Sequence, residues 1–338
     1  MNKTKKVMIT GVGGMDGSIL ADKYLAKGYE VFGIDRWYPT GMSINLKTAL
    51  EYETFTFISG DICEHDFITR NIKEIQPNYF FNMAAISLVP ESFKIPQTVF
   101  KTNCLAVINI LEAIRTYSPT TKFYQASTSE QIGSNIEHPQ NTESMMLPNS
   151  PYAIAKLSSY HMVRSYRKAF GLFASNGMLW NHEGPRRGPA FVTRKITLGV
   201  SAIDKGQKQF ISLGNLDSSR DWGLADNFCD AMMLIMEADE PDDYAINTGE
   251  THTIREFVVE AFRHIGKKIV WIGSGLDEIG VDQDGIVRVK INERYYRPVE
   301  VPYLHGDHTK AKEKLGWTPT TKFKELVKIM MMSDLGVE

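Results

Sequence analysis

The run Val7-Met-Ile-Thr-Gly-Val-Gly-Gly-Met-Asp-Gly17 decides the fold expected for this chain. Its first residues are apolar or β-branched and predict a short strand, which is followed by Gly11, Gly14 and Gly17. Apolar residues then recur at helical spacing as far as Lys27. A strand, a glycine-rich turn and a helix in this order bring the backbone close to the diphosphate of a dinucleotide.

The same alternation continues outward from this turn through the first half of the chain. Strands are predicted at 30–34, 55–59, 79–83 and 122–126, with a helical stretch ending near 76–77 and a long helix over 100–117 between them. Strands that alternate with helices imply a parallel sheet covered on both faces. We therefore expect an α/β fold, a Rossmann-type doubly wound parallel sheet, with a smaller mixed C-terminal lobe that binds the substrate.

The second half is less regular, with Gly-Pro breaks at 184–185 and 188–189 and helices predicted over 192–204 and 254–265. The lobes are expected to interleave. The predicted dinucleotide domain covers 1–180 plus about 220–250, and the predicted substrate lobe covers 181–219 and 251–338.

The end of the second strand bears on the choice of dinucleotide. Asp35 can accept hydrogen bonds from the ribose hydroxyls of NAD and would repel a 2′-phosphate, whereas Arg36 favours NADP. We give Asp35 more weight and predict NAD(H), with NADP(H) as the alternative. The residues expected to contact the dinucleotide are Gly11, Gly14, Met15, Asp16, Gly17, Asp35, Arg36, Asp61, Ile62, Met83, Ala84, Ala85, Tyr152 and Lys156.

Tyr152 and Lys156 form a YxxxK pattern, which on a helix places both side chains on one face. A neighbouring ammonium favours the phenolate and is expected to lower the pKa of Tyr152. Such a tyrosine can take a hydroxyl proton while a nicotinamide takes the hydride. Thr128 and Glu130 follow the strand at 122–126, where open parallel sheets place ligands. Thr128 can bind a sugar hydroxyl, and Glu130 adds a base that a simple dehydrogenase does not need.

These motifs resemble the extended short-chain dehydrogenases and, more closely, the GDP-mannose 4,6-dehydratase family. The resemblance extends over nearly the whole chain. It is carried by the segments Phe123-Tyr-Gln-Ala-Ser-Thr-Ser-Glu130, Asn181-His-Glu-Gly-Pro-Arg-Arg-Gly188, Phe191-Val-Thr-Arg-Lys-Ile-Thr197, Leu213-Gly-Asn-Leu-Asp217, Arg220-Asp-Trp-Gly223, Tyr295-Tyr-Arg-Pro-Val-Glu300 and Lys314-Leu-Gly-Trp317.

The resemblance implies a hydro-lyase that converts GDP-mannose to GDP-4-keto-6-deoxy-mannose. Tyr152 would deprotonate the 4-hydroxyl, Glu130 would remove the C5 proton, water would leave C6, and the hydride would return to C6. Arginines suit a diphosphate because they pair with it bidentately. The residues expected to bind the GDP-sugar are Ser87, Asn181, Arg187, Val192, Lys195, Leu213, Gly214, Asn215, Arg220, Arg297 and Glu300.

Some positions depart from the family pattern and keep alternatives open. Asp35-Arg36-Trp37 replaces consecutive arginines that hold NADP and contribute to tetramer contacts, and Ile86 and Leu88 replace polar residues near the sugar. A site with fewer hydrogen-bonding groups rejects analogues less strongly, so a GDP-D-glycero-D-manno-heptose is an alternative substrate. A 4-dehydrogenase, reductase or epimerase, which needs only Tyr152 and the cofactor, and a non-catalytic nucleotide sensor are further alternatives.

Bulk properties restrict the partners. Lys and Arg total 38 and Asp and Glu total 40, and this near balance favours neither nucleic acid nor a membrane surface. The three cysteines are far apart and form no metal-binding spacing, so no metal is expected. The N-terminus shows no signal-peptide pattern and no apolar run has the length of a membrane span, which predicts a cytoplasmic protein. A homodimer or homotetramer is expected by analogy with the fold.

Overall fold

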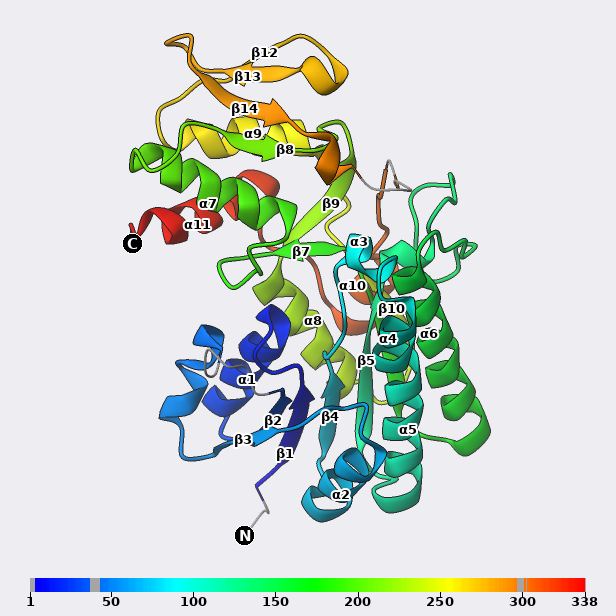
Figure 1. Cartoon of the computed structure of the whole chain (residues 1–338). Coiled ribbons are helices and arrows are strands. Elements are labelled where there is room, and N and C mark those ends of the chain that lie inside the picture. The colour runs from blue at the N-terminus through cyan, green and yellow to red at the C-terminus, as the bar shows by residue number, and fades with distance from the viewer. Residues whose placement is uncertain (1–3, 37–42, 297–300, 302, 338) are drawn as a thin grey trace.

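The computed structural model describes residues 4–36, 43–296, 301 and 303–337. Arg297 and Glu300 lie outside these residues, as does the segment that begins at Trp37. The described part of the chain forms two lobes, drawn below and above the short strand β7 (Asn181–Glu183) in Figure 1. The lower lobe contains the glycine-rich turn.

The strands of the lower lobe build a seven-stranded parallel sheet in the order β3-β2-β1-β4-β5-β6-β10. The order reverses beside β1, which is the topological switch point where doubly wound folds bind ligands. The predicted Rossmann-type sheet is therefore confirmed. The strands are β1 (Lys6–Thr10), β2 (Glu30–Asp35), β3 (Phe55–Ser59), β4 (Tyr79–Asn82), β5 (Lys122–Thr128), β6 (Ala174–Leu179) and β10 (Asp243–Ile246).

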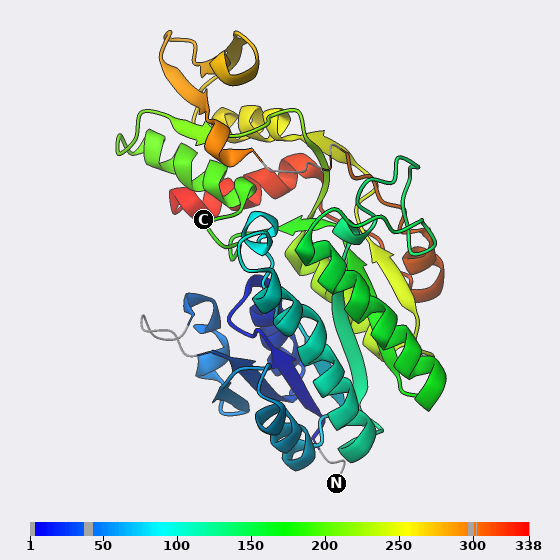
Figure 2. The ribbon, with the colours of Figure 1, turned by 45° about the vertical axis from the view of Figure 1, so that its right-hand side comes forward.

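Helices cover both faces of this sheet, as Figures 1 and 2 show. One face packs against α1 (Met15–Ala26) and α8 (Ala225–Glu237) through a cluster that contains Tyr24 and Met232. The other face packs against α2 (His65–Ile75), α5 (Ala106–Tyr117) and α6 (Pro151–Phe170). Because helices cover both faces, the inner strands β4 and β6 are buried along their whole length rather than at alternate residues.

The long helix predicted over 100–117 begins earlier and is interrupted. It starts as α4 (Pro96–Phe100), passes through the π-turn η3 (Lys101–Leu105) and continues as α5. Pro96 at the first turn fits a helix start, because its missing N–H is not needed there. The π-turn widens the helix at Asn103. The Asn103 carboxamide accepts a hydrogen bond from the Ile86 N–H and donates one to the Ile86 carbonyl.

The upper lobe is mixed, as predicted. Its four-stranded sheet has the order β12-β13-β14-β8, and its apolar side chains, among them Trp222 and Phe257, pack with three helices. The strands are β8 (Ile211–Leu213), β12 (Val270–Ile272), β13 (Ile279–Val281) and β14 (Val287–Ile291), and the helices are α7 (Val192–Asp204), α9 (Ile254–Arg263) and α11 (Phe323–Leu335). A smaller sheet, β11 (Thr251–Thr253), β9 (Ser219–Leu224) and β7, connects the lobes.

The chain crosses between the lobes more than once. After α7 and β8 in the upper lobe, the chain passes back to the lower lobe. There α8 packs on the parallel sheet and β10 forms its last strand. Helix α10 (Thr309–Leu315) also lies on the lower lobe, where Ala311 and Trp317 join the cluster of α1 and α8. The exact domain limits stay a prediction. None of the helices in the described part of the chain combines the length and apolar character needed to cross a bilayer.

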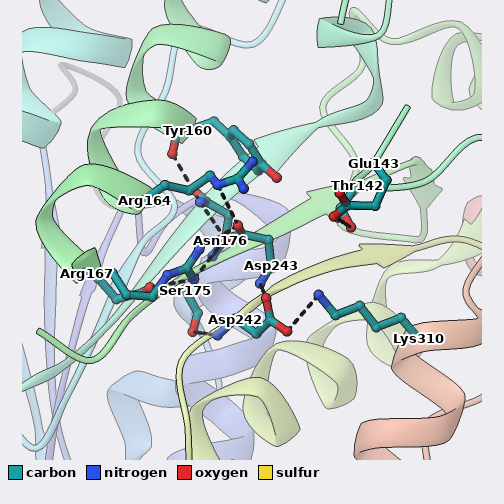
Figure 3. Close-up of polar contacts among 11 residues, drawn as sticks. Thr142, Glu143, Tyr160, Arg164, Arg167, Ser175, Asn176, Asp242, Asp243 and Lys310 are labelled. Atoms are coloured by element: carbon teal, nitrogen blue, oxygen red, sulfur yellow. Dashed lines mark hydrogen bonds and ion pairs between the residues drawn. The ribbon is translucent and has the colours of Figure 1, made fainter. Parts of the chain in front are cut away.

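A buried ion pair fixes the helix α6 to the edge of the sheet (Figure 3). Asp243 at the start of β10 accepts hydrogen bonds from both terminal nitrogens of Arg167, at 2.6 and 3.1 Å, and from the Asn176 amide at 2.8 Å. The Asp243 side chain is only 6% exposed, and Arg167 lies in the last turn of α6. This pair therefore joins the returning strand to the helix that carries Tyr152 and Lys156.

Substitution Asp243→Ala is expected to lower the free energy of unfolding by about 3 kcal/mol, because it leaves a largely buried guanidinium without its carboxylate. Denaturant unfolding measures the effect. The control is Asp230→Ala, which breaks a half-exposed pair with Lys23 and is expected to cost less than about 1 kcal/mol. Equal losses in the two variants would contradict a special role for Asp243.

Candidate active site

A cavity of about 930 Å³ lies at the carboxyl ends of the parallel strands and extends to the upper lobe. This volume suits a site for small molecules. Every described residue that the sequence predicted for the site contributes to its lining. These residues are Gly11, Gly14, Met15, Asp16, Gly17, Asp35, Arg36, Asp61, Ile62, Met83, Ala84, Ala85, Ser87, Thr128, Glu130, Tyr152, Lys156, Asn181, Arg187, Val192, Lys195, Leu213, Gly214, Asn215 and Arg220.

The glycine-rich turn has the close packing that a dinucleotide cradle requires. Gly11 has a φ of +66°, and a Cβ there would lie 2.8 Å from the Ala84 backbone. A Cβ on Gly17 would lie 2.4 Å from the Gly11 carbonyl oxygen. Gly14 is the N-cap of α1 and supplies no capping side chain, so the first amides of the helix remain available to an anion. The turn fits a dinucleotide diphosphate.

Asp35 lies at the end of β2, beside this turn. One carboxylate oxygen accepts the Gly13 N–H at 2.9 Å, and the other accepts the Arg36 N–H at 2.8 Å. These bonds fix the carboxylate at the cavity wall, and each oxygen retains a further lone pair for a ribose hydroxyl. Arg36 lines the same part of the cavity.

Tyr152 and Lys156 lie on the first turns of α6, and both side chains are buried. The Lys156 Nζ donates to the Ala126 carbonyl at 2.8 Å. The prediction that Lys156 lowers the pKa of Tyr152 is wrong for the protein alone. Burial raises the pKa of Tyr152 to about 12, with a hydrogen bond from Thr128 opposing the shift and the charge of Glu130 adding to it.

Lys156 responds to the same apolar surroundings. Burial lowers the pKa of Lys156 to about 8, although the carboxylate of Asp16 opposes this change. Burial thus shifts both groups towards their neutral forms, although a pKa of about 8 leaves the Lys156 amine mostly protonated at neutral pH. A cationic nicotinamide ring would supply positive charge of the kind that favours the phenolate.

Thr128 and Glu130 reach the same end of the cavity from the end of β5 and from the short helix η4 (Ser129–Gln131). Thr128 Oγ1 accepts the Glu130 N–H at 3.2 Å, which orients the turn, and the Thr128 hydroxyl bonds to Tyr152. Glu130 is half-buried. A base, a hydroxyl donor and a tyrosine therefore surround one region of the cavity.

Cationic side chains from the upper lobe and its connections line another part. Arg187 forms an ion pair with the buried Glu183 at 3.0 Å, and its guanidinium lies 3.6 Å from the centre of the Phe191 ring. The Lys195 ammonium lies over Tyr295, 3.0 Å from the ring centre. Burial lowers the pKa of Lys195, and the nearby tyrosine opposes this shift. These cations suit a diphosphate.

Sequence reasoning missed several lining residues. Asn45, His182, Glu183 and Arg186 belong to this group. His182 donates from Nδ1 to the Trp180 carbonyl at 2.7 Å and places Nε2 2.9 Å from the Asp16 carboxylate. Burial opposes the charged imidazole, but Asp16 raises the pKa of His182 overall. The motif at 181–188 contains His182 and Arg186, but their pairing with Asp16 and Asp22 of α1 depends on how the lobes meet.

The model of the GDP-mannose 4,6 dehydratase family matches residues 8–330 of the chain. The chain belongs to this family. Among its relatives, the GDP-mannose 4,6 dehydratase of Drosophila melanogaster is 43% identical, with 99% of this chain and 87% of that protein covered. The human GDP-mannose 4,6 dehydratase is also 43% identical, with 99% and 93% covered. The resemblance inferred from the motifs is thereby confirmed.

Solved structures support the fold. A dTDP-glucose 4,6-dehydratase from Bacillus anthracis in complex with NAD has a TM-score of 0.81 at 21% identity, covering 98% of this chain and 96% of that one. The UDP-glucose 4-epimerase of Thermotoga maritima with UDP-glucose has a TM-score of 0.81 at 25% identity, with 98% of each chain covered. The family membership therefore separates this chain from epimerases that share its architecture.

Proposed function

We propose that this protein is a hydro-lyase that converts GDP-mannose to GDP-4-keto-6-deoxy-mannose. The observation that carries the proposal is the placement of Glu130 in one cavity with Thr128, Tyr152 and Lys156. An epimerase or a simple dehydrogenase has no need of the additional base. Membership of the GDP-mannose 4,6-dehydratase family supports the same conclusion.

The chemistry begins at the sugar C4. When bound, a nicotinamide dinucleotide accepts the C4 hydride and returns it at C6. Tyr152 takes the proton of the 4-hydroxyl, and Thr128 holds the phenol in position through its hydrogen bond. Lys156 contributes positive charge beside this proton transfer, and its bond to the Ala126 carbonyl keeps it in place.

Elimination follows because a C4 ketone acidifies the proton on C5. Glu130 removes that proton and protonates the departing 6-hydroxyl, so one water molecule is lost without net consumption of a proton. C6 would then take back the hydride and C5 would gain a proton, which the proton taken by Tyr152 from the 4-hydroxyl balances, and the 4-keto-6-deoxy sugar would be complete. Arg187, Lys195 and Arg220 would hold the diphosphate away from the reacting carbons.

The proposed dinucleotide is NAD. The Asp35 carboxylate, fixed by two backbone N–H groups, can accept from ribose hydroxyls and would repel a 2′-phosphate. NADP remains the alternative, since Arg36 lines the same wall. The complexes of related folds include both cofactors, NAD in the dehydratase above and NADPH in the RMD protein of Pseudomonas aeruginosa, which has a TM-score of 0.77 at 20% identity over 98% of this chain and 99% of that one.

Substitution Asp35→Ser is expected to shift the preference from NAD towards NADP by at least about tenfold, because it removes the charge that repels the 2′-phosphate. Titration of the purified protein with NADH and NADPH measures the ratio of dissociation constants. Asp61→Ser, at the end of a neighbouring strand, serves as the control. An unchanged ratio in Asp35→Ser would contradict the proposed discrimination.

The sugar is tested directly. Incubation with GDP-mannose and with GDP-D-glycero-D-manno-heptose, followed by mass spectrometry, separates the reactions. Loss of one water without net cofactor reduction supports a dehydratase and identifies its substrate. An unchanged mass would indicate an epimerase, and a gain or loss of two hydrogens would indicate a dehydrogenase or reductase. The heptose is included because Ile86 and Leu88, which line the cavity, replace polar residues of the family pattern near the sugar.

We also propose a homodimer, with a homotetramer as the alternative. Neighbouring helices carry exposed apolar side chains, with Phe100 on α4, Leu105 at the end of η3 and Ile154 on α6. A second copy would remove this apolar surface from water. Light scattering of the purified protein measures the assembly, and a monomeric mass at working concentration would contradict the proposal.

A further inference from the structure

Residues 182–188, called the strap here, begin in β7 and continue in the loop that leads towards α7 (Figure 1). The strap connects the lobe-joining sheet to the upper lobe, yet several of its contacts are made with the dinucleotide lobe. At its start, His182 pairs with Asp16 in the first turn of α1 at 2.9 Å. Two turns further along α1, Arg186 forms an ion pair with Asp22 at 2.6 Å.

A second anchor ties the strap to the glycine-rich turn. The Asn45 amide donates to the Gly13 carbonyl at 3.2 Å and to the Arg186 carbonyl at 3.4 Å. The Ser43 hydroxyl donates to the same Gly13 carbonyl at 2.8 Å. One amide therefore joins three segments that are distant in sequence, the turn, the segment that begins η1 (Ile44–Leu46) and the strap.

The strap and the turn line the same cavity. Gly13, Gly14 and Met15 contribute from the turn, and Arg186 and Arg187 contribute from the strap. The strap also passes closely, since a Cβ on Gly184 would lie 3.9 Å from the Met15 sulfur. Arg186 Nη1 is buried and has no hydrogen-bond partner among the described residues, so the strap retains an unused donor beside the cavity.

The proposed reaction makes cofactor retention important. The hydride that leaves C4 must return to C6 of the same sugar, and a reduced cofactor that dissociates between these steps leaves an oxidised intermediate behind. A segment anchored across the cradle would raise the barrier to that loss. Loosening that segment would lower this barrier, and changes of this kind mostly act on the dissociation rate.

We propose that the strap, held by the Arg186–Asp22 ion pair and by Asn45, retains the dinucleotide between the two hydride transfers. The proposal rests on the proposed function for its purpose, but its physical content is a slow cofactor dissociation rate. Arg186 and Asn45 are positioning residues in this account, because they act through the placement of the strap.

The test measures the dissociation of NADH from the purified full chain without any sugar. Energy transfer from tryptophan to bound NADH is followed after mixing with excess NAD. Arg186→Met and Asp22→Asn are each expected to accelerate dissociation about tenfold. Both substitutions remove the same ion pair, between Arg186 and Asp22. NADH is therefore expected to dissociate from the double variant no faster than from the faster single variant.

Two further variants separate the strap from general stability. Lys23→Met breaks the ion pairs of the adjacent α1 residue with Asp226 and Asp230 on α8. No strap residue takes part in these pairs, so the rate is expected to stay unchanged. Asn45→Ala removes the second anchor without disturbing a charge pair and is expected to accelerate dissociation. This variant keeps the test decisive if Arg186→Met does not fold.

Two results would overturn the proposal. Dissociation rates within about twofold of the unmodified protein in Asp22→Asn and Asn45→Ala would exclude retention by the strap, and an equal acceleration in Lys23→Met would assign the effect to α1 as a whole. Failure of the unmodified protein to bind either NADH or NADPH would instead contradict the proposed function. The two failures are therefore distinguishable.

Discussion

Substitution Glu130→Gln is expected to abolish water loss while C4 oxidation continues. The amide nearly matches the carboxylate in shape but cannot take the C5 proton, and general acid–base groups of this kind contribute about 10²–10⁴-fold in rate. Turnover to the 4-keto-6-deoxy product should fall by that factor. The first hydride transfer does not require Glu130, so GDP-mannose should still cause reduction of the bound cofactor.

The measurement combines product analysis with the near-ultraviolet absorbance of the reduced nicotinamide. The control is Glu143→Gln, an exposed glutamate outside the cavity lining, which should behave like the unmodified protein. Full dehydratase activity in Glu130→Gln would exclude the proposed base. Loss of both product and cofactor reduction would indicate that Glu130 acts before elimination or positions the substrate.

Substitution Tyr152→Phe is expected to stop the reaction one step earlier. The substitution removes the phenol oxygen that accepts the 4-hydroxyl proton and that bonds to Thr128. Turnover should therefore fall by about 10²–10⁴-fold. Neither product nor reduced cofactor should accumulate. Dinucleotide binding should persist, because the glycine-rich turn and Asp35 are untouched.

Tyr160→Phe is the matched control for this prediction. Tyr160 lies on the same helix and is buried, and its hydroxyl has no hydrogen-bond partner among the described residues. Removal of that hydroxyl should change neither rate nor stability appreciably. Cofactor reduction at a normal rate in Tyr152→Phe would contradict the assignment of the C4 base.

Much of the fold was predictable because it depends on local patterns. The helix over 192–204 and the strand over 55–59 have the predicted limits, since apolar periodicity and turn residues define them. The interruption of the helix after Phe100 was not predictable. A π-turn adds no sequence signal of its own, and its partner, the Ile86 backbone, lies on a different segment.

The site was predictable where residues follow strand ends and not where the lobes meet. Thr128 and Asp35 follow from the rule that parallel sheets place ligands at the carboxyl ends of strands. Arg186 and Asp22 are 164 residues apart in sequence, and only the path of the strap brings them together. The prediction that the pKa of Tyr152 is lowered was wrong for a related reason. The spacing to Lys156 does not reveal how deeply the phenol is buried.

The central claim is an internal transfer of hydride from C4 to C6 with loss of water. The most direct test is incubation of the purified protein with GDP-mannose that carries deuterium at C4, followed by mass spectrometry and NMR of the product. The account predicts a GDP-4-keto-6-deoxy sugar that has lost one water and carries the deuterium at C6, with no net change in the cofactor. A product of unchanged mass, or one whose deuterium is found in the released cofactor, would contradict it.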